Sequence, residues 1–267
     1  MSTAATQMPE ILRQQRRLTP GESFCFKCHS ELACFGDCCA DVNILLTPLD
    51  VLRLARRFGI TTREFLEIHT LVPITKDLHL PLVMLRMEDD PGRRCPFVGA
   101  QGCTVYEDRP WACRMYPLGM ALPPARAGVT PEAVYFVFEE NFCQGRGEKS
   151  PWTVKAWRAD QGLDARDALE AGFQETVSHP WFIGGRQLDP RRMEMFFTAC
   201  YDLDTFRGLV LSPVFLSRFE LEDGLVEQLA HEDEALLRFA SRWLRFALFA
   251  EPTMRVRDDA PAPRRTP

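Results

Sequence analysis

Cysteine is the residue that most constrains this chain, because nine of its ten cysteines fall within the first 143 of 267 residues. Five of them crowd into fifteen positions and four follow, in the order Cys25, Cys28, Cys34, Cys38, Cys39, Cys95, Cys103, Cys113 and Cys143. This density is far above that of an average chain and needs a chemical reason. Disulfide bonds and metal ligation are the two chemistries that use many cysteines.

The redox compartment decides between these two chemistries. Residues 1–18 are polar and lack the apolar core of a secretory signal. We therefore expect a cytoplasmic protein whose thiols stay reduced and bind metal. No apolar stretch approaches the roughly 20 residues that span a bilayer, so no membrane partner is expected. The formal net charge of -5 gives no basic surface for nucleic acid. A protein partner is left open.

The composition changes near residue 150, and this change predicts the fold class. We expect an α+β, mostly helical chain: a metal-organised, turn-rich cysteine-cluster half with a few short strands, then a helical C-terminal half. The expected segments are a flexible leader (1–22), a cysteine-cluster metal-binding domain (23–150), a helical region (151–250) and a disordered tail (251–267).

Capping residues and apolar periodicity predict the individual elements. Thr47, Pro48 and Asp50 form a capped helix start, and Gly59 ends that helix. Thr61 or Thr62 caps a second short helix. Strands are expected at 82–87 and 134–138, a surface loop at 122–131, and helices at 152–162, 164–179, 191–211 and 224–250.

The spacing of the first cysteines suits a metal site. The Cys-x-x-Cys at 25–28 and the Cys-x-x-x-Cys-Cys at 34–39 let a tight loop present two sulfurs to one ion, about 2.3 Å away. Three common templates do not fit. A bacterial ferredoxin run needs a cysteine where Glu31 stands, and a radical-SAM triplet needs one in place of Asp41. A zinc ribbon needs a second Cys-x-x-Cys.

Adjacent Cys38 and Cys39 carry a further hint. Neighbouring side chains point in different directions, so both sulfurs rarely reach one tetrahedral ion. Either one of them is a spectator or the pair divides between two sites.

Thiolate sites are also negatively charged, and Arg109 and Arg114 are candidates to offset that charge. Arg114 directly follows Cys113. Simple solvation is the alternative role for both arginines.

Long, ordered motifs resemble a known family. They are Phe24 to Cys39, Leu46-Thr47-Pro48-Leu49-Asp50-Val51, Cys95-Pro96-Phe97, Cys103-Thr104-Val105-Tyr106 and Arg109-Pro110-Trp111-Ala112-Cys113-Arg114-Met115-Tyr116-Pro117. Over roughly residues 24–145 the chain is similar to the YkgJ-like cysteine-cluster proteins, a zinc- or iron-chelating family. The resemblance implies as ligands Cys28, Cys34, Cys38, Cys39, Cys95, Cys103, Cys113 and Cys143. The short form common in the family packs its first cysteines closer to the double cysteine, which leaves the role of Cys25 as a ligand open.

Eight such cysteines suit two four-thiolate sites, or one cluster with spare ligands. The Cys95-Pro96 step resembles the one beside iron–sulfur clusters, and the donors are all thiolates. We therefore expect an iron–sulfur cluster, most simply [4Fe–4S]. Zinc is the alternative, because it can organise a turn-rich segment that lacks a core.

The remaining candidates have ordinary explanations. His29 follows Cys28 and could ligate, but a solvated loop histidine is the alternative. Cys200 lies in an apolar helical stretch and is interpreted as a small buried hydrophobe. No phosphate-binding loop, Gly-x-Ser-x-Gly or His-Glu-x-x-His motif occurs.

Three functions follow from this pattern. The first is a cytoplasmic iron–sulfur or iron protein whose site transfers electrons or senses redox state. The second is a zinc-stabilised module whose helical half engages a protein partner. The third is a protein-modifying enzyme that uses the metal site; some relatives of the family are protein methyltransferases, but no cofactor-binding motif here supports that transfer.

Overall fold

The computed structural model describes residues 16–73, 80–121, 133–182 and 185–258. Within them the chain forms two compact units whose segments alternate along the sequence. We call the unit of residues 16–42, 87–106 and 111–164 the cysteine unit, and that of residues 43–86, 107–110 and 165–258 the helical unit. The segment 43–86 thus groups with the C-terminal helices, whereas composition suggested one boundary near residue 150.

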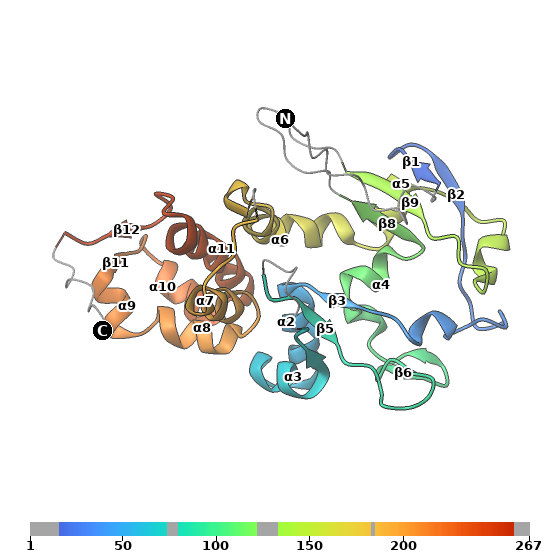
Figure 1. The fold of residues 1–267 in the computed structure, drawn as a ribbon, viewed down its shortest axis with the longest axis horizontal. Coiled ribbons are helices and arrows are strands. Elements are labelled where there is room, and N and C mark those ends of the chain that lie inside the picture. Colours follow the sequence, from blue (N-terminus) through green and yellow to red (C-terminus); the bar gives the residue numbers. More distant parts are fainter. Residues whose placement is uncertain (1–15, 74–79, 122–132, 183–184, 259–267) are drawn as a thin grey trace. The chain divides into compact units, whose positions relative to one another are not determined.

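Small antiparallel sheets and short helices build the cysteine unit (Figure 1). One sheet has the order β1-β9-β8, and a second joins β2 to β10. The bounds are β1 Arg17–Leu18, β2 Ser23–Cys25, β8 Leu118–Ala121, β9 Val134–Val137, β10 Pro151–Thr153, α4 Trp111–Met115 and α5 Val154–Asp160. The strand predicted at 134–138 and the helix predicted at 152–162 are confirmed. β1 falls in the segment expected to be a flexible leader. The rest of that leader, residues 1–15, and the loop predicted at 122–131 lie outside the described residues.

These elements enclose a hydrophobic core. It consists of Leu18, Phe24, Phe26, Met115, Leu118, Tyr135, Val137, Val154, Trp157 and Leu163. Burying one large apolar side chain contributes about 1.5–3 kcal/mol, so this unit has an interior of its own. The half expected to be organised by metal therefore also has a hydrophobic core, to which Met115, 1% exposed, belongs.

Two cysteine-bearing loops of this unit contribute little to that core. Residues 27–42 contain no buried residue, and residues 88–106 bury Phe97 and Val105 alone. Their regular structure consists of the single turn η1 (Asp37–Cys39), the hairpin of β6 (Val98–Gly99) with β7 (Gly102–Cys103), a β-bridge between Ala40 and Arg94, and the start of η2 (Tyr106–Asp108). Few buried apolar contacts therefore hold these loops.

The helical unit begins with two capped helices. Thr47 caps α2 (Pro48–Phe58): its hydroxyl accepts from the Asp50 N–H at 3.2 Å, and the Asp50 carboxylate accepts from the Thr47 N–H at 3.0 Å. Gly59, at φ 67°, ends α2. Thr61 caps α3 (Thr62–His69) with the same capping box. Both predicted helix starts are confirmed.

A three-stranded sheet accompanies these helices. Its order is β3 (Leu45–Leu46), β5 (Val83–Leu85) and β4 (Thr70–Leu71), with antiparallel pairing throughout. β5 confirms the strand predicted at 82–87. Alternation along the strands buries Leu46, Val83 and Leu85 and leaves Leu45 and Leu71 at the surface.

The rest of the helical unit is a set of helices followed by a short hairpin. The bounds are α6 Leu163–Val177 (whose first two residues belong to the cysteine unit), α7 Pro190–Cys200, α8 Leu203–Val210, α9 Pro213–Arg218, α10 Leu225–His231, α11 Asp233–Phe249, β11 Phe219–Glu220 and β12 Arg255–Val256. The prediction for α6 is confirmed, and the helices predicted at 191–211 and 224–250 are each divided in two. β12 and the buried Met254 lie in the segment expected to be a disordered tail, whose residues 259–267 are outside the described part.

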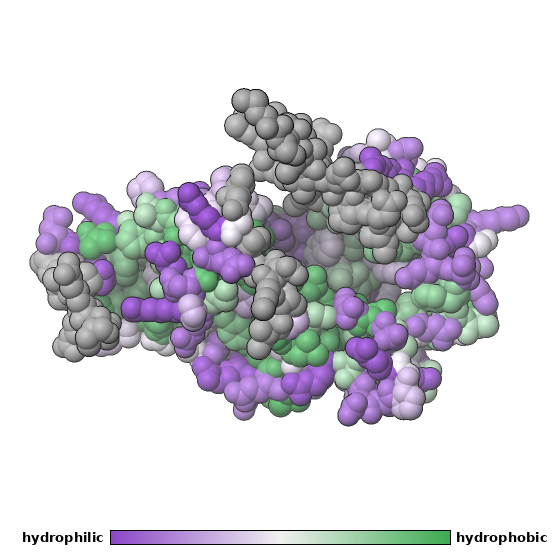
Figure 2. Space-filling model, viewed as in Figure 1, coloured by the Kyte–Doolittle hydropathy of each residue, from purple (hydrophilic) through white to green (hydrophobic). Residues whose placement is uncertain are grey.

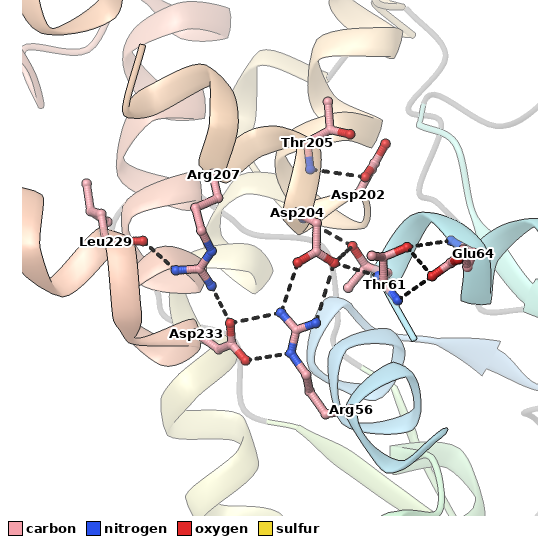
Figure 3. Close-up of polar contacts among 10 residues, drawn as sticks. Arg56, Thr61, Glu64, Asp202, Asp204, Thr205, Arg207, Leu229 and Asp233 are labelled. Carbon is pink, nitrogen blue, oxygen red and sulfur yellow. Dashed lines mark hydrogen bonds and ion pairs between the residues drawn. The ribbon is translucent and has the colours of Figure 1, made fainter. Parts of the chain in front are cut away.

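A polar network joins α2, α3, α8 and α11 inside the helical unit (Figure 3). Arg56 donates to both Asp204 (Nη2 to Oδ1, 3.1 Å) and Asp233 (Nε to Oδ2, 2.9 Å). Asp233 also accepts from Arg207, and Asp204 accepts from the main-chain N–H of Thr62 at 2.6 Å. The carboxylates therefore fix helices that are far apart in the sequence.

The surface in view is mixed in character. Figure 2 shows hydrophilic side chains across this face with hydrophobic residues between them. Among the described residues, no helix combines the length and apolar character needed to cross a bilayer.

Candidate metal centre

Main-chain hydrogen bonds hold Cys143 and its neighbours against the first cysteine loop. The Lys27 N–H donates to the Gly145 carbonyl oxygen at 3.0 Å, and the Gln144 N–H donates to Cys34 Sγ at 3.2 Å. A Cβ at Gly145 would lie 2.8 Å from the Lys27 carbonyl oxygen, so glycine permits this close approach. Cys143 thus joins the loop although more than a hundred residues separate them in sequence.

Four cysteines make up what we call the first cysteine group: Cys28, Cys34, Cys38 and Cys143. Burial, and then the charges of the other three thiols, raise the pKa of Cys28 to about 11. Electrostatic effects of this kind fall off with distance and require the charges to lie near one another. Cys28 therefore lies in the neighbourhood of each of the other three thiols.

A second set of main-chain contacts gathers other cysteines. The Cys95 N–H donates to the Cys39 carbonyl oxygen at 2.7 Å, which fixes the two loops against each other. The Val98 N–H donates to the Cys95 carbonyl oxygen at 3.1 Å, and Val98 pairs with Cys103 in the β6–β7 hairpin. The chain therefore folds back so that Cys103 returns towards Cys95.

The second cysteine group comprises Cys39, Cys95, Cys103 and Cys113, the last on α4. A hydrogen bond to Cys38, then burial, and then the charges of Cys38, Cys95 and Cys113 raise the pKa of Cys39. Burial raises the pKa of Cys95, with a smaller contribution from the charge of Cys103. These electrostatic contacts link all four members of the group.

Adjacent Cys38 and Cys39 are the point where the two groups meet. The Cys39 thiol is hydrogen-bonded to Cys38, and this bond is the main reason that the pKa of Cys38 falls to about 7. The thiolate of Cys38 neighbours the first group, whereas Cys39 neighbours the second. Division of the pair between two sites, with a spectator cysteine as the alternative, stays a prediction.

The donors in both groups are thiols. All ten cysteines lie in the described part of the chain, and none of them forms a disulfide. No three Cys, His, Asp or Glu side chains of the described residues stand in an arrangement that could hold a metal ion. Ligation would therefore require the sulfurs of a group to draw closer together and release their protons. Sets of four thiolates fit zinc or an iron–sulfur cluster in donor chemistry.

The remaining predicted site residues are Arg109, Arg114 and Cys25. Arg114 Nη1 donates to the Gln161 carbonyl oxygen at 2.9 Å. Arg109 is half-buried and belongs to the helical unit. Cys25 is exposed on β2, opposite Pro151, and is not among the main electrostatic neighbours of either group. The roles of Arg109 and Arg114 as charge partners, and of Cys25 as a ligand, stay predictions.

Two further predicted residues have ordinary surroundings. His29 lies 3.8 Å from the carboxylate oxygens of both Glu31 and Glu148, at the surface. Cys200 is 3% exposed, inside the helical unit, as predicted for a small hydrophobe.

Tyr116 is a site residue that sequence reasoning missed. Burial, and then a hydrogen bond to Cys143, raise the pKa of this phenol. The Tyr116 hydroxyl also donates to Glu140 Oε2 at 3.1 Å. Hydrogen bonds to the ligands of a metal orient them and tune the site. The motif from Arg109 to Pro117 contains Tyr116, but nothing in its spacing indicates contact with a cysteine 27 residues away.

Residues 27–144 match the family model CxxCxxCC, described as a putative zinc- or iron-chelating domain. This match confirms, over that span, the resemblance seen in the cysteine motifs, and it supports metal binding without naming zinc or iron. No curated protein and no solved structure matches the chain.

Proposed function

We propose that the chain is a cytoplasmic iron–sulfur protein whose thiolate-ligated site takes part in electron transfer or redox sensing. The observation that carries this proposal is the gathering of eight reduced cysteines from four separate stretches of the cysteine unit into linked electrostatic contacts.

The residues around the cysteines suit such a site. When bound, an iron–sulfur cluster supplies a centre that gains or loses one electron. The Gln144 N–H, which contacts Cys34, would then donate to a ligated sulfur. Hydrogen bonds to sulfur stabilise the more negative, reduced state and so set the potential. The electron would come from a reduced redox protein and pass to an oxidised one.

A zinc-stabilised protein-interaction module is the second candidate function, and one observation favours it. Residues 27–42 have no buried side chain, yet they hold four of the eight cysteines. A structural metal could supply the free energy that this loop lacks, as it does in small zinc domains. In that case the helical unit would engage a protein partner, and the metal would have no redox role.

Anaerobic purification of the full chain separates the two candidates. The electron-transfer proposal expects iron and acid-labile sulfide, little zinc, and a broad visible absorbance that decreases reversibly when dithionite is added. A colourless protein with stoichiometric zinc and no sulfide would overturn it in favour of the zinc module. A protein free of both metals would contradict metal binding altogether.

A further inference from the structure

Two loops of the cysteine unit hold six of the eight predicted ligands: the first cysteine loop (residues 27–42) and the second cysteine loop (residues 88–106). Main-chain hydrogen bonds join these loops. The Cys95 N–H donates to the Cys39 carbonyl oxygen at 2.7 Å, and the Asp41 N–H donates to a carbonyl oxygen of the second loop at 3.0 Å. Both bonds lie between backbone groups, so neither depends on a sulfur or on a metal.

The backbone conformation at this junction is unusual on both sides. Asp41, at φ 50°, and Arg93, whose carbonyl oxygen accepts from the Asp41 N–H, at φ 45°, are both in the left-handed region. A residue other than glycine adopts this conformation at a cost of about 1–3 kcal/mol, and keeps it where the surrounding structure imposes it. The contact between the loops therefore fixes the local backbone of each.

A contact between a ring and a glycine joins the loops at a second place. The Phe35 ring rests against Gly102, where an added Cβ would lie 2.9 Å from the ring Cζ. Gly102 also has φ 102°, a conformation that favours glycine. Phe35 follows Cys34, and Gly102 precedes Cys103. The contact therefore brings the neighbour of one predicted ligand against the neighbour of another.

We propose that Phe35 and Gly102 are positioning residues, which with the main-chain bonds dock the two cysteine loops independently of metal. This proposal rests on the proposed metal binding and adds how the chain prepares for it. No three potential ligand side chains of the described residues are placed to hold an ion, so ligation still requires sulfurs to move within the docked loops. Docking in advance reduces the ordering that ligation must bring about. Metal then makes local opening of the loops rarer, but it does not create their contact.

Hydrogen exchange of the metal-free full chain tests the docking directly. A chelator removes metal, elemental analysis confirms the removal, and mass spectrometry or NMR follows the Asp41 and Cys95 amides. In the wild type both should exchange more slowly than in an unstructured chain, and Phe35→Ala should accelerate them about tenfold. Phe142→Ala is the matched control, because Phe142 also adjoins a predicted ligand but is 45% exposed. Exchange of the wild-type amides at the unstructured rate would overturn the proposal without any variant.

A double-mutant cycle separates the ring contact from the backbone strain at Gly102. Gly102→Ala forces alanine into the left-handed region in any background, whereas its steric conflict with the ring requires Phe35. Gly102→Ala should therefore accelerate exchange of the Cys95 amide more in the wild-type background than in the Phe35→Ala background. Equal effects in the two backgrounds would contradict the contact.

Binding of Zn²⁺ alone, measured by competition with a chromophoric chelator, connects the docking to the metal site. Apparent affinity falls with the population of the competent form, so Phe35→Ala should bind Zn²⁺ about tenfold more weakly although it keeps every cysteine. Phe142→Ala should bind as the wild type does, and equal affinity in wild type and Phe35→Ala would overturn the positioning role. A wild-type chain with slow exchange that takes up neither zinc nor iron would overturn the proposed metal binding. Fast exchange in a chain that binds metal would overturn the docking alone.

Discussion

Glu170 is a carboxyl group that the fold holds in an unusual environment. It is 4% exposed in the helical unit, where its Oε1 accepts from the Leu49 N–H at 2.9 Å. Arg166, one turn earlier on α6, donates to the buried Asp50. Burial, and then the negative charge of Asp50, raise the pKa of Glu170 to about 8, so this residue is protonated at neutral pH.

This shift predicts how stability depends on pH. The folded-state pKa of Glu170 lies above its ordinary value of 4.5, so the folded protein binds the proton more tightly than the unfolded chain. The contribution of Glu170 to the free energy of unfolding is therefore complete below about pH 4.5 and is lost as pH rises through about 8. Glu170→Gln, which keeps an acceptor for Leu49 and cannot ionise, should lose less stability than wild type between pH 6 and pH 9.

Urea denaturation of both proteins at several pH values measures this difference. Titration of the cysteines is common to the two proteins, so the comparison isolates Glu170. Each unit of pKa shift corresponds to about 1.4 kcal/mol, so a difference in slope of that order is expected. Parallel pH profiles for wild type and Glu170→Gln would contradict a protonated Glu170.

Asp204 shows how one residue sets the boundaries of several elements. It lies on α8 but accepts from the N–H of Thr62 at 2.6 Å and from the Thr62 hydroxyl at 2.9 Å. Thr62 is the first residue of α3 and is fully buried. The same carboxylate accepts from Arg56 near the end of α2. A helix start that its own capping box does not fully satisfy is thus completed by a distant helix.

Replacing Asp204 tests this contact. Asp204→Ala should lower the free energy of unfolding by about 1–3 kcal/mol, because it leaves the buried N–H and hydroxyl of Thr62 without this acceptor. Asp204→Asn keeps one carbonyl oxygen for Thr62 and is the matched control, with a smaller loss expected. Chemical denaturation followed by circular dichroism provides the comparison. Equal losses in the two variants would show that the charge, rather than the hydrogen bonds to Thr62, stabilises the unit.

Capping residues predicted where a helix starts, but apolar periodicity did not predict where a long helical stretch breaks into two helices. The caps at Thr47 and Thr61 depend on residues within one turn, and both helices begin where the sequence indicates. The helix predicted at 191–211 is instead broken, because the Asp202 side chain accepts from the Thr205 N–H and starts α8. The break before α11 lies beside Asp233, whose partners Arg56 and Arg207 come from other helices. Apolar periodicity continues through such breaks and does not reveal them.

At the scale of the whole molecule, the two units differ in what metal would contribute to them. The cysteine unit has a hydrophobic core, but its loops at 27–42 and 88–106 contribute little to it. Most helices belong to the helical unit, which contains none of the eight predicted ligands. Metal binding should therefore stabilise the cysteine loops and change the helix content little.

Removal of metal from the full chain tests this separation. With a chelator present, trypsin should cleave faster at the exposed Lys27, Arg93 and Arg94, while the far-ultraviolet circular dichroism of the helices changes little. Chelator added to the Cys200→Ala variant should give the same pattern, since this cysteine lies in the helical unit. Loss of helical signal in parallel with loss of metal would show that the helical unit also depends on the metal.

The list of candidate ligands could be predicted from the sequence, but their grouping could not. Ligand spacing and the family motifs select the eight cysteines, because both are written in local sequence. Which sulfurs neighbour each other depends on contacts between distant loops, such as that of Gln144 with Cys34. The hydrophobic core of the cysteine unit was missed for the same reason: Leu18, Met115 and Trp157 come from separate segments.

X-ray absorption at the edge of the bound metal tests the central claim most directly, because it reports the atoms that surround the ion. For the anaerobically purified full chain, the claim predicts a nearest shell of sulfur alone, at about 2.3 Å. An added iron–iron distance would indicate a cluster, and its absence with zinc would indicate a structural ion. A shell dominated by nitrogen or oxygen would contradict ligation by the cysteines.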